Sequence, residues 1–194
     1  LNLGLAEADG QLTSCELMSE AALAMTVRHV PGARSPLGRP HPWYLLLEVS
    51  SAESAGAARA LIERIATRAQ RERLSAEIVS AADPEEAERF WQLRLALSEV
   101  QKAEGASIKH DVSLPLARVP EFLRRADEAV RALVPGCRPV PFGHVGDGNI
   151  HFNVSQPEGM AADVFIARWR EMNAAVHAIA GELGGSIAAD DRLL

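Results

Sequence analysis

The sequence predicts an α+β fold in which an antiparallel sheet is covered by helices. Short strand-like stretches are interspersed with segments whose apolar residues recur at helical spacing. One pair of strands is joined by a glycine-rich loop, as in an antiparallel hairpin. The 194 residues, 47% of them hydrophobic, suffice for one sizeable core or for two small lobes that share a sheet.

The first 42 residues combine a helix-like segment at 15–30 with a Pro/Gly-rich stretch at 31–42, which we expect to be an exposed loop. Residues 43–51, WYLLLEVSS, are apolar on both faces, as expected of an interior strand. A helix is expected at 54–73 from the spacing of its apolar residues. Residues 75–81, SAEIVSA, predict a second short strand.

The next helix is marked by its first residues. Asp83 is the expected N-cap, Pro84 takes the first helical position, and acidic residues fill the first turn. Gly105 is expected to end this helix. Residues 107–114 then alternate between an apolar and a charged face, which predicts a two-faced strand.

The last part of the chain contains two helices around a hairpin. Residues 118–134 are amphipathic, and the hairpin is PFGHVGDGNIHFNV at 141–154. A long helix is expected at about 161–183, with glycines after it as a plausible C-cap.

Composition excludes several classes of partner. The net charge of −6 argues against nucleic acid or an anionic membrane surface as the main partner. No apolar run is long enough for a membrane span. Cys15 and Cys137 lie far apart without zinc-ribbon or CxxC spacing, so a reducing, cytoplasmic location is expected.

The hairpin carries the first candidate site. His151 and Asn153 point to one face of their strand, and the tight return is expected to bring His144 to the same side. Two imidazoles that face one space are the start of a zinc-type site, whereas the simpler interpretation is a hydrogen-bonded hairpin. The glycine loop also suggests a phosphate cradle, but it lacks the Lys-Ser/Thr ending of a P-loop.

Three further polar residues are candidates, and two of them have two interpretations each. Arg94 and Ser98 are four apart on one predicted helix and therefore share a face. The Arg94 head is either solvated at the end of a snorkelling side chain or a fork for a substrate carboxylate. Lys109, on the polar face of its strand, has the same ambiguity.

Several stretches together resemble the C-terminal substrate or cap domain of FAD-linked oxidases. They are WYLLLEVSS, FWQLRLALSEVQKAEGASIKHDVSLPLARVPEFL, VPFGHVGDGNIHFNV and LGGSI. The order and spacing are those of the vanillyl-alcohol-oxidase-like superfamily, in the branch with D-2-hydroxyglutarate dehydrogenase, D-lactate dehydrogenase and the glycolate oxidase flavin subunit. The resemblance thus implies that residues 1–194 form one such domain with ferredoxin-like elements, in which 1–42 are a partial N-terminal helix and loop. Nothing matches the glycine-rich segments of the FAD-binding domain, which we expect to be absent from this chain.

The resemblance implies roles for the candidate residues. It implies that the substrate is held by Arg94, Ser98, Lys109 and Asn153, and that a divalent metal, zinc or manganese, is held by His144, His151 and Asp190. The family continues GGSISAEHG where this chain has GGSIAADDRLL. Asp190 therefore takes the place of the metal-binding Glu, and Asp191 that of the His expected to act as base. Aspartate does not replace an imidazole that titrates near neutral pH, so the catalytic base is unknown.

The implied activity is the metal-assisted oxidation of a D-2-hydroxy acid, of the lactate, glycolate or hydroxyglutarate class, to the 2-oxo acid. Without FAD, we expect the chain alone to be inactive. The alternative is a diverged non-catalytic cap domain that binds a metal or a small carboxylate, or forms a homodimer through its sheet. A zinc hydrolase is a third class, but the sequence has no HExxH helix and no evident nucleophile with its base.

Overall fold

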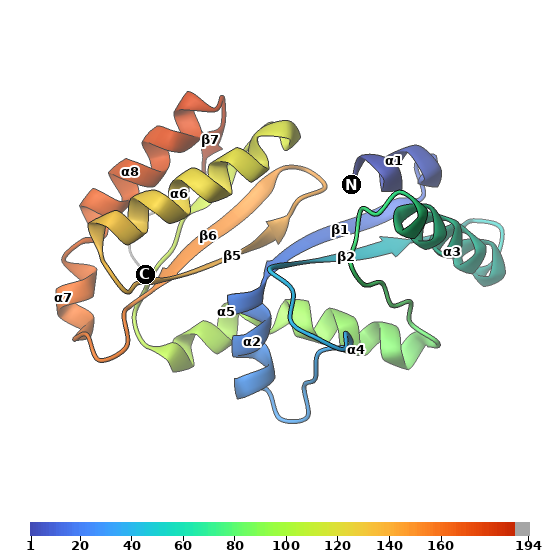
Figure 1. Ribbon diagram of the computed structural model, residues 1–194, viewed down its shortest axis with the longest axis horizontal. Helices are drawn as coiled ribbons and strands as arrows, with labels where there is room; N and C mark the ends of the chain where they lie inside the picture. Colours follow the sequence, from blue (N-terminus) through green and yellow to red (C-terminus); the bar gives the residue numbers. More distant parts are fainter. Residues whose placement is uncertain (189–194) are drawn as a thin grey trace.

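An antiparallel sheet is the centre of the fold, as the α+β class predicts (Figure 1). The computed structural model describes residues 1–188, and within them the sheet has seven strands. Their order is β2-β1-β5-β6-β4-β7, and β3 pairs with a further part of β6. Every pair is antiparallel, so neighbouring strands are connected by hairpins or longer loops and not by parallel crossovers.

The strands are β1 (Leu12–Ser19), β2 (Trp43–Val49), β3 (Ser107–Ile108), β4 (Asp111–Ser113), β5 (Arg138–His144), β6 (Asn149–Ser155) and β7 (Ser186–Ile187). The helices are α1 (Asn2–Ala8), α2 (Glu20–His29), α3 (Ala55–Arg71), α4 (Pro84–Leu95), α5 (Leu97–Val100), α6 (Val119–Leu133), α7 (Ala162–Ile166) and α8 (Trp169–Glu182), with short 3-10 turns η1 (Gln101–Glu104) and η2 (Leu116–Arg118). In this part of the chain, no helix is long and apolar enough to cross a membrane.

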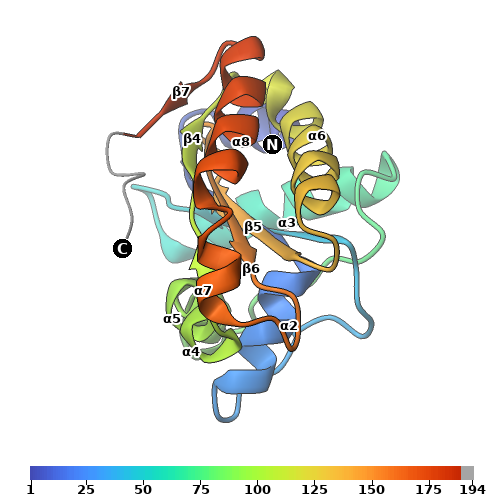
Figure 2. The ribbon, with the colours of Figure 1, turned by 90° about the vertical axis from the view of Figure 1, so that its left-hand side faces the viewer.

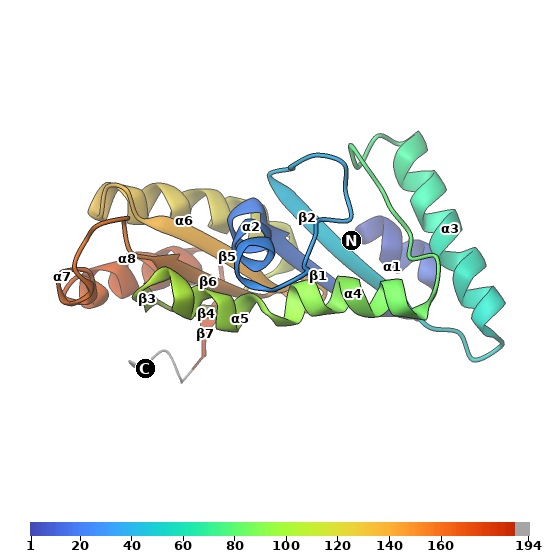
Figure 3. The same cartoon turned by 90° about the horizontal axis from the view of Figure 1, so that it is seen from below.

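Helices cover both faces of the sheet. On one face, α6 and α8 lie side by side over β5 and β6, where Ile150, Phe152 and Val154 point into the larger core (Figure 2). On the other face, α2, α4 and α5 pack against Val140 and Phe142 (Figure 3). The alternation of β6 therefore puts His151 and Asn153 on the side of α4 and α5.

The predicted helix at 15–30 is wrong in its first part. Cys15–Ser19 belong to β1, and α2 begins only at Glu20, after the N-cap Ser19. β1 lies between β2 and β5 and is buried on both faces over its last five residues. Tertiary pairing on two sides thus overrides a spacing that also fits a helix. The correction matters because β1 carries Glu16.

Two strand predictions also change. β2 exists, but as an edge strand rather than an interior one. Its two apolar faces arise because Leu47 and Val49 pack towards α3 while Tyr44 and Leu46 pack towards α2 and α4. The strand predicted at 75–81 is wrong, because these residues form a loop without strand pairing.

Three other elements form with interruptions. Asp83 caps α4 as predicted, its carboxylate accepting from the Glu86 amide at 2.8 Å, but the helix breaks at Ala96 before α5 begins. The strand at 107–114 keeps its alternation but divides into β3 and β4 around His110, whose ring lies 2.7 Å from the Phe152 carbonyl oxygen (Nδ1 to O). The last helix is divided into α7 and α8.

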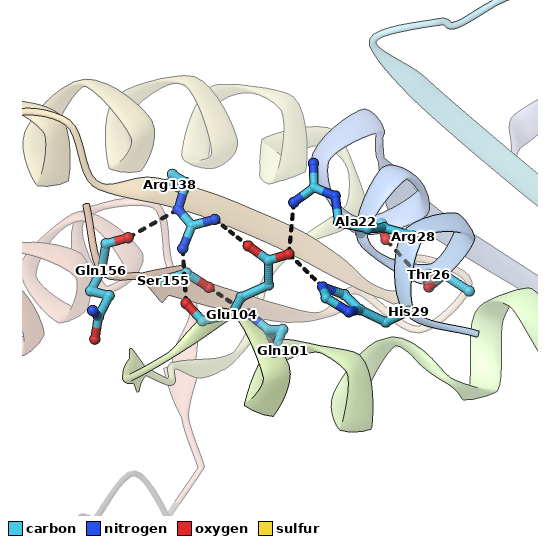
Figure 4. A network of polar contacts seen from close by, with 9 residues as sticks. All are labelled: Ala22, Thr26, Arg28, His29, Gln101, Glu104, Arg138, Ser155 and Gln156. Carbon is cyan, nitrogen blue, oxygen red and sulfur yellow. Dashed lines mark hydrogen bonds and ion pairs between the residues drawn. The ribbon is translucent and has the colours of Figure 1, made fainter. Parts of the chain in front are cut away.

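A carboxylate network fastens α2, η1 and β5 together (Figure 4). Glu104 Oε1 accepts from Arg28 Nη1 at 2.8 Å and lies 2.6 Å from His29 Nε2, and Glu104 Oε2 pairs with Arg138. Only 7% of the Glu104 side chain is exposed. The hydrogen bond from His29, together with Arg138 and Arg28, lowers the pKa of Glu104 to about 2 despite its burial.

We expect this network to make the free energy of unfolding depend on pH in the acidic range. The folded-state pKa of Glu104 lies below the ordinary value of 4.5, so its contribution is fully present above pH 4.5 and is lost as the pH falls to about 2. The contribution is about 2 to 3 kcal/mol, by the conversion of 1.36 kcal/mol per pKa unit with allowance for solvent. Glu104→Gln should lower the free energy of urea unfolding by that amount at pH 7 and much less at pH 2.5.

The matched control is Glu128→Gln. Glu128 pairs with Arg124 on the surface of α6, with both side chains more than half exposed. Surface pairs contribute about 0 to 1 kcal/mol, so this variant should follow the wild-type pH dependence. Equal pH profiles for Glu104→Gln and the wild type would contradict the assignment.

Candidate functional site

The hairpin of β5 and β6 brings the two candidate histidines together. His144 ends β5, and His151 lies opposite Phe142 in the ladder. The two imidazole rings are nearly perpendicular, with centroids 5.8 Å apart. His151 also lies 5.2 Å from the Phe142 ring, centroid to centroid. Both rings therefore occupy one side of the sheet, on the face that α4 and α5 cover.

Glu16 is the residue that links this pair to Arg94. It lies on β1 directly opposite His144 in the ladder, with only 4% of its side chain exposed. Its Oε2 accepts from Arg94 Nε at 2.8 Å, and its Oε1 lies 2.9 Å from His144 Nδ1. Ser14, two residues earlier on the same face, donates its hydroxyl to Oε1 at 2.8 Å. We call Glu16, Arg94, His144 and His151 the polar cluster.

Sequence reasoning missed Glu16, because its segment was assigned to a helix. The available signal was an acid within LTSCELM, a stretch in which strand alternation is as good as helical spacing. An acid at the centre of such a strand is rarely buried without a cationic partner. That rule predicts a partner for Glu16 but does not identify it.

Arg94 is neither a snorkelling residue nor exposed. Its guanidinium is buried, with 7% of the side chain exposed, and its Cζ atom lies 5.1 Å from the Phe142 ring centroid. Within residues 1–188, its Nη2 is buried and has no hydrogen-bond partner. Such a donor carries an uncompensated desolvation cost, so an anion that reaches it gains a strong, charge-assisted hydrogen bond.

Both imidazoles have Nδ1 directed at a carboxylate. Asp111, opposite His151 in the ladder, places Oδ1 3.6 Å from His151 Nδ1 and accepts from Asn149 Nδ2 at 2.7 Å. Glu16 is the corresponding partner of His144. Burial lowers the pKa of His151, with Arg94 and His144 adding to the effect and Asp111 and Glu16 opposing it. A neutral His151 is the form that binds metals.

The other predicted substrate residues surround the cluster unevenly. Asn153 is buried on the same face as His151, and its Nδ2 donates to Gln101 Oε1 at 2.6 Å. Lys109 is exposed on the polar side of its strand, and its charge lowers the pKa of Glu99 together with the closer Lys102. Ser98 is exposed on α5, beyond the break at Ala96, so it does not share one continuous helix with Arg94.

A complete metal site is not found in the part of the chain that the structure describes. Residues 1–188 contain no group of three or more His, Cys, Asp or Glu side chains arranged to hold a metal ion. His144 and His151 supply two imidazoles at most. The predicted third ligand, Asp190, and the neighbouring Asp191 lie outside the described residues.

A cavity lies on the face of the sheet opposite the polar cluster. It has a volume of about 820 Å³ and is lined mainly by apolar side chains, among them Leu17, Leu45, Leu123 and Phe152. None of the predicted site residues lines it. Size alone therefore does not identify the functional site, and the polar cluster is the better candidate because it gathers buried charge.

Comparison with known proteins agrees with the resemblance seen in the sequence. Residues 4–190 match the family described as FAD linked oxidases, C-terminal domain. The chain is 28% identical to the D-2-hydroxyglutarate dehydrogenase of Xanthomonas citri pv. viticola over 93% of its own length and 37% of the relative's. It is 31% identical to the enzyme of the same name from Stutzerimonas stutzeri, covering 92% of the chain and 38% of the relative. A rat relative, named as mitochondrial, is 26% identical over 94% of the chain and 32% of its own length. The chain thus spans less than two fifths of these relatives.

Proposed function

The chain belongs to the family of C-terminal domains of FAD-linked oxidases, and on that premise we propose that it is the substrate-binding part of an enzyme that oxidises a D-2-hydroxy acid to the 2-oxo acid. Several relatives are named D-2-hydroxyglutarate dehydrogenases, and one is named a putative D-lactate dehydrogenase. The observation that carries the proposal is the buried Arg94 guanidinium, with its unpartnered Nη2, beside two imidazoles on one face of the sheet.

The substrate-binding role follows from the charges on this face. We propose that Arg94 binds the carboxylate of the 2-hydroxy acid, because a guanidinium offers several N–H donors in a fixed plane. In this proposal Lys109 adds a second, exposed cation on the same face, and Asn153 adds a buried amide that would contact polar groups of the substrate. Ser98 is the least supported of the four residues, since the helix break separates it from Arg94.

Among the described residues, the two imidazoles offer nitrogen ligands that suit a divalent metal. Nδ1 of each ring faces a carboxylate, which leaves Nε2 as the nitrogen for a ligand bond, in the manner of carboxylate–histidine–metal arrangements. We propose that His144 and His151 are two of its ligands and that Asp190 is the third. The chemistry that FAD would supply when bound is a hydride acceptor for the α-carbon, and a bound metal would supply positive charge that lowers the pKa of the substrate hydroxyl.

The metal assignment is tested on the chain itself. Calorimetric titration with zinc and with manganese should show one site, and the double variant His144→Ala/His151→Ala should bind the metal at least 100-fold more weakly. The matched control is His41→Ala, since His41 lies in a loop where Nε2 contacts Glu77 at 2.9 Å. An unchanged affinity in the double variant would remove the metal from the proposal and favour a diverged domain that binds carboxylate alone.

The activity is tested in the FAD-loaded enzyme that contains this domain. Arg94→Lys keeps the charge but loses the planar set of donors, so kcat/KM for D-2-hydroxyglutarate or D-lactate should fall by about 100-fold, equivalent to about 2.7 kcal/mol. Arg89→Lys, on the exposed side of the same helix, is the control. Turnover that is insensitive to Arg94→Lys would count against a substrate role for this residue.

We also propose a reducing compartment for the enzyme, the cytoplasm in the first instance. Cys15 and Cys137 are both free and buried, and burial raises the pKa of the Cys15 thiol to about 11. The mitochondrial names of some relatives make the mitochondrial matrix the alternative to examine.

A further inference from the structure

Glu16 has a geometry that ion pairing alone does not explain. A carboxylate that serves only to neutralise an arginine typically binds it with both oxygens, since the bidentate pair is the stronger arrangement. Glu16 instead divides its oxygens, giving Oε2 to Arg94 Nε and Oε1 to His144 Nδ1. Each partner is therefore held by a single nitrogen, and each keeps another nitrogen for a ligand.

We propose that Glu16 is the positioning residue of the polar cluster, which orients His144 through Nδ1 and Arg94 through Nε so that His144 Nε2 and Arg94 Nη2 are presented to the bound metal and substrate. The proposal rests on the function proposed above and assigns a role to a residue outside the predicted site.

The hydrogen bond to His144 fixes the tautomer of that ring. A carboxylate only accepts, so a neutral His144 that bonds to it must carry its proton on Nδ1. Nε2 then has a free lone pair, which is the form that a metal requires. Without the hydrogen bond to Glu16, the His144 ring, which is 52% exposed, is free to rotate and to exchange its proton between the two nitrogens through solvent.

The backbone makes Glu16 a rigid support. Glu16 and His144 face each other across β1 and β5, and β1 is paired on both sides, so their relative position is set by ladder hydrogen bonds. The Ser14 hydroxyl holds Oε1 from the same strand. A ligand geometry supported from a central strand is more precise than one supported from a loop.

Glu16 also leaves Arg94 with a donor for a ligand. Glu16 engages Nε, near the base of the guanidinium, and leaves the buried Nη2 without a partner in the described residues. The ion pair with Glu16 compensates the buried charge, while the remaining donors stay available to a substrate carboxylate. One carboxylate thus serves both the metal side and the substrate side of the cluster.

The test is the tautomer of His144, read by long-range proton–nitrogen NMR of the imidazoles at pH 8.5 in the metal-free chain. The wild type should show the proton on Nδ1. Glu16→Gln is nearly isosteric and can donate its amide to Nδ1, so it should shift His144 towards the form protonated at Nε2. Zinc affinity should fall by 10-fold or more in the same variant.

The matched control is Glu48→Gln, an exposed acid on the neighbouring strand β2, which should leave both readouts unchanged. A wild-type His144 protonated at Nε2 would overturn the proposal whether or not Glu16→Gln folds. So would a folded Glu16→Gln variant that keeps the Nδ1 proton and the wild-type zinc affinity. If the wild type binds no zinc, the metal function fails, and the tautomer measurement still decides the role of Glu16.

Discussion

Replacing Arg94 by methionine is expected to lower the free energy of unfolding by about 3 to 5 kcal/mol. The change leaves the Glu16 carboxylate buried, with 4% of its side chain exposed, and without its cation. Breaking a buried pair by removing one partner has a cost of this size, because the remaining buried charge loses its cation and keeps only its contacts with Ser14 and His144. Urea unfolding of Arg94→Met at pH 7 measures the effect directly.

Two further variants test whether the loss of stability comes from breaking the buried pair of Arg94 and Glu16. Arg89→Met, in the same helix, breaks an exposed pair with Glu85 and should cost less than about 1 kcal/mol. The double variant Arg94→Met/Glu16→Met removes both buried charges and should recover most of the loss, since apolar pairs often replace buried ion pairs at little cost. Additive losses in the double variant would mean that Arg94 and Glu16 stabilise the fold independently.

Gly148→Ala is the second large effect, with an expected loss of about 3 kcal/mol or more in urea unfolding. Gly148 has a φ of +80°, and a Cβ at this position would lie 2.1 Å from the Leu114 carbonyl oxygen. The left-handed conformation costs about 1 to 2 kcal/mol for a residue with a side chain. Overpacking adds about 1 to 3 kcal/mol, and here the obstacle is backbone, which cannot rotate away.

Gly159→Ala separates the conformational cost from the overpacking cost. Gly159 has nearly the same φ, +78°, and a Cβ there would meet no atom within 4 Å. Only the conformational cost should remain, about 1 to 2 kcal/mol. Equal losses in the two variants would show that the approach to Leu114 relaxes, and that the glycine loop is less tightly held than the structure indicates.

The glycine loop has a structural reason for at least one of its glycines. The Gly148 carbonyl accepts from the Leu114 amide at 3.0 Å, so the loop is bound to the chain that follows β4. This contact helps to fix the start of β6, and with it the position of His151. Gly148 of GHVGDGN therefore serves the site through its close packing against Leu114.

The sequence by itself determined the elements whose signals are local. Asp83 and Pro84 mark the start of α4, the alternation at 107–114 gives the buried and polar faces of β3 and β4, and the turn after His144 gives the hairpin. The approach of His144 and His151 belongs to this class, because seven residues and one turn set it. The resemblance that pointed to the family rests on the same short motifs.

Only the tertiary structure decided the partners of those residues. Glu16 is 78 residues from Arg94 and 128 from His144, and no periodicity within a segment encodes such pairs. The same holds for β1, whose residues fit a helix or a strand until β2 and β5 bind it on both sides. Local spacing fixes which face a side chain takes, whereas the sum of long-range strand pairing and burial fixes what it meets there.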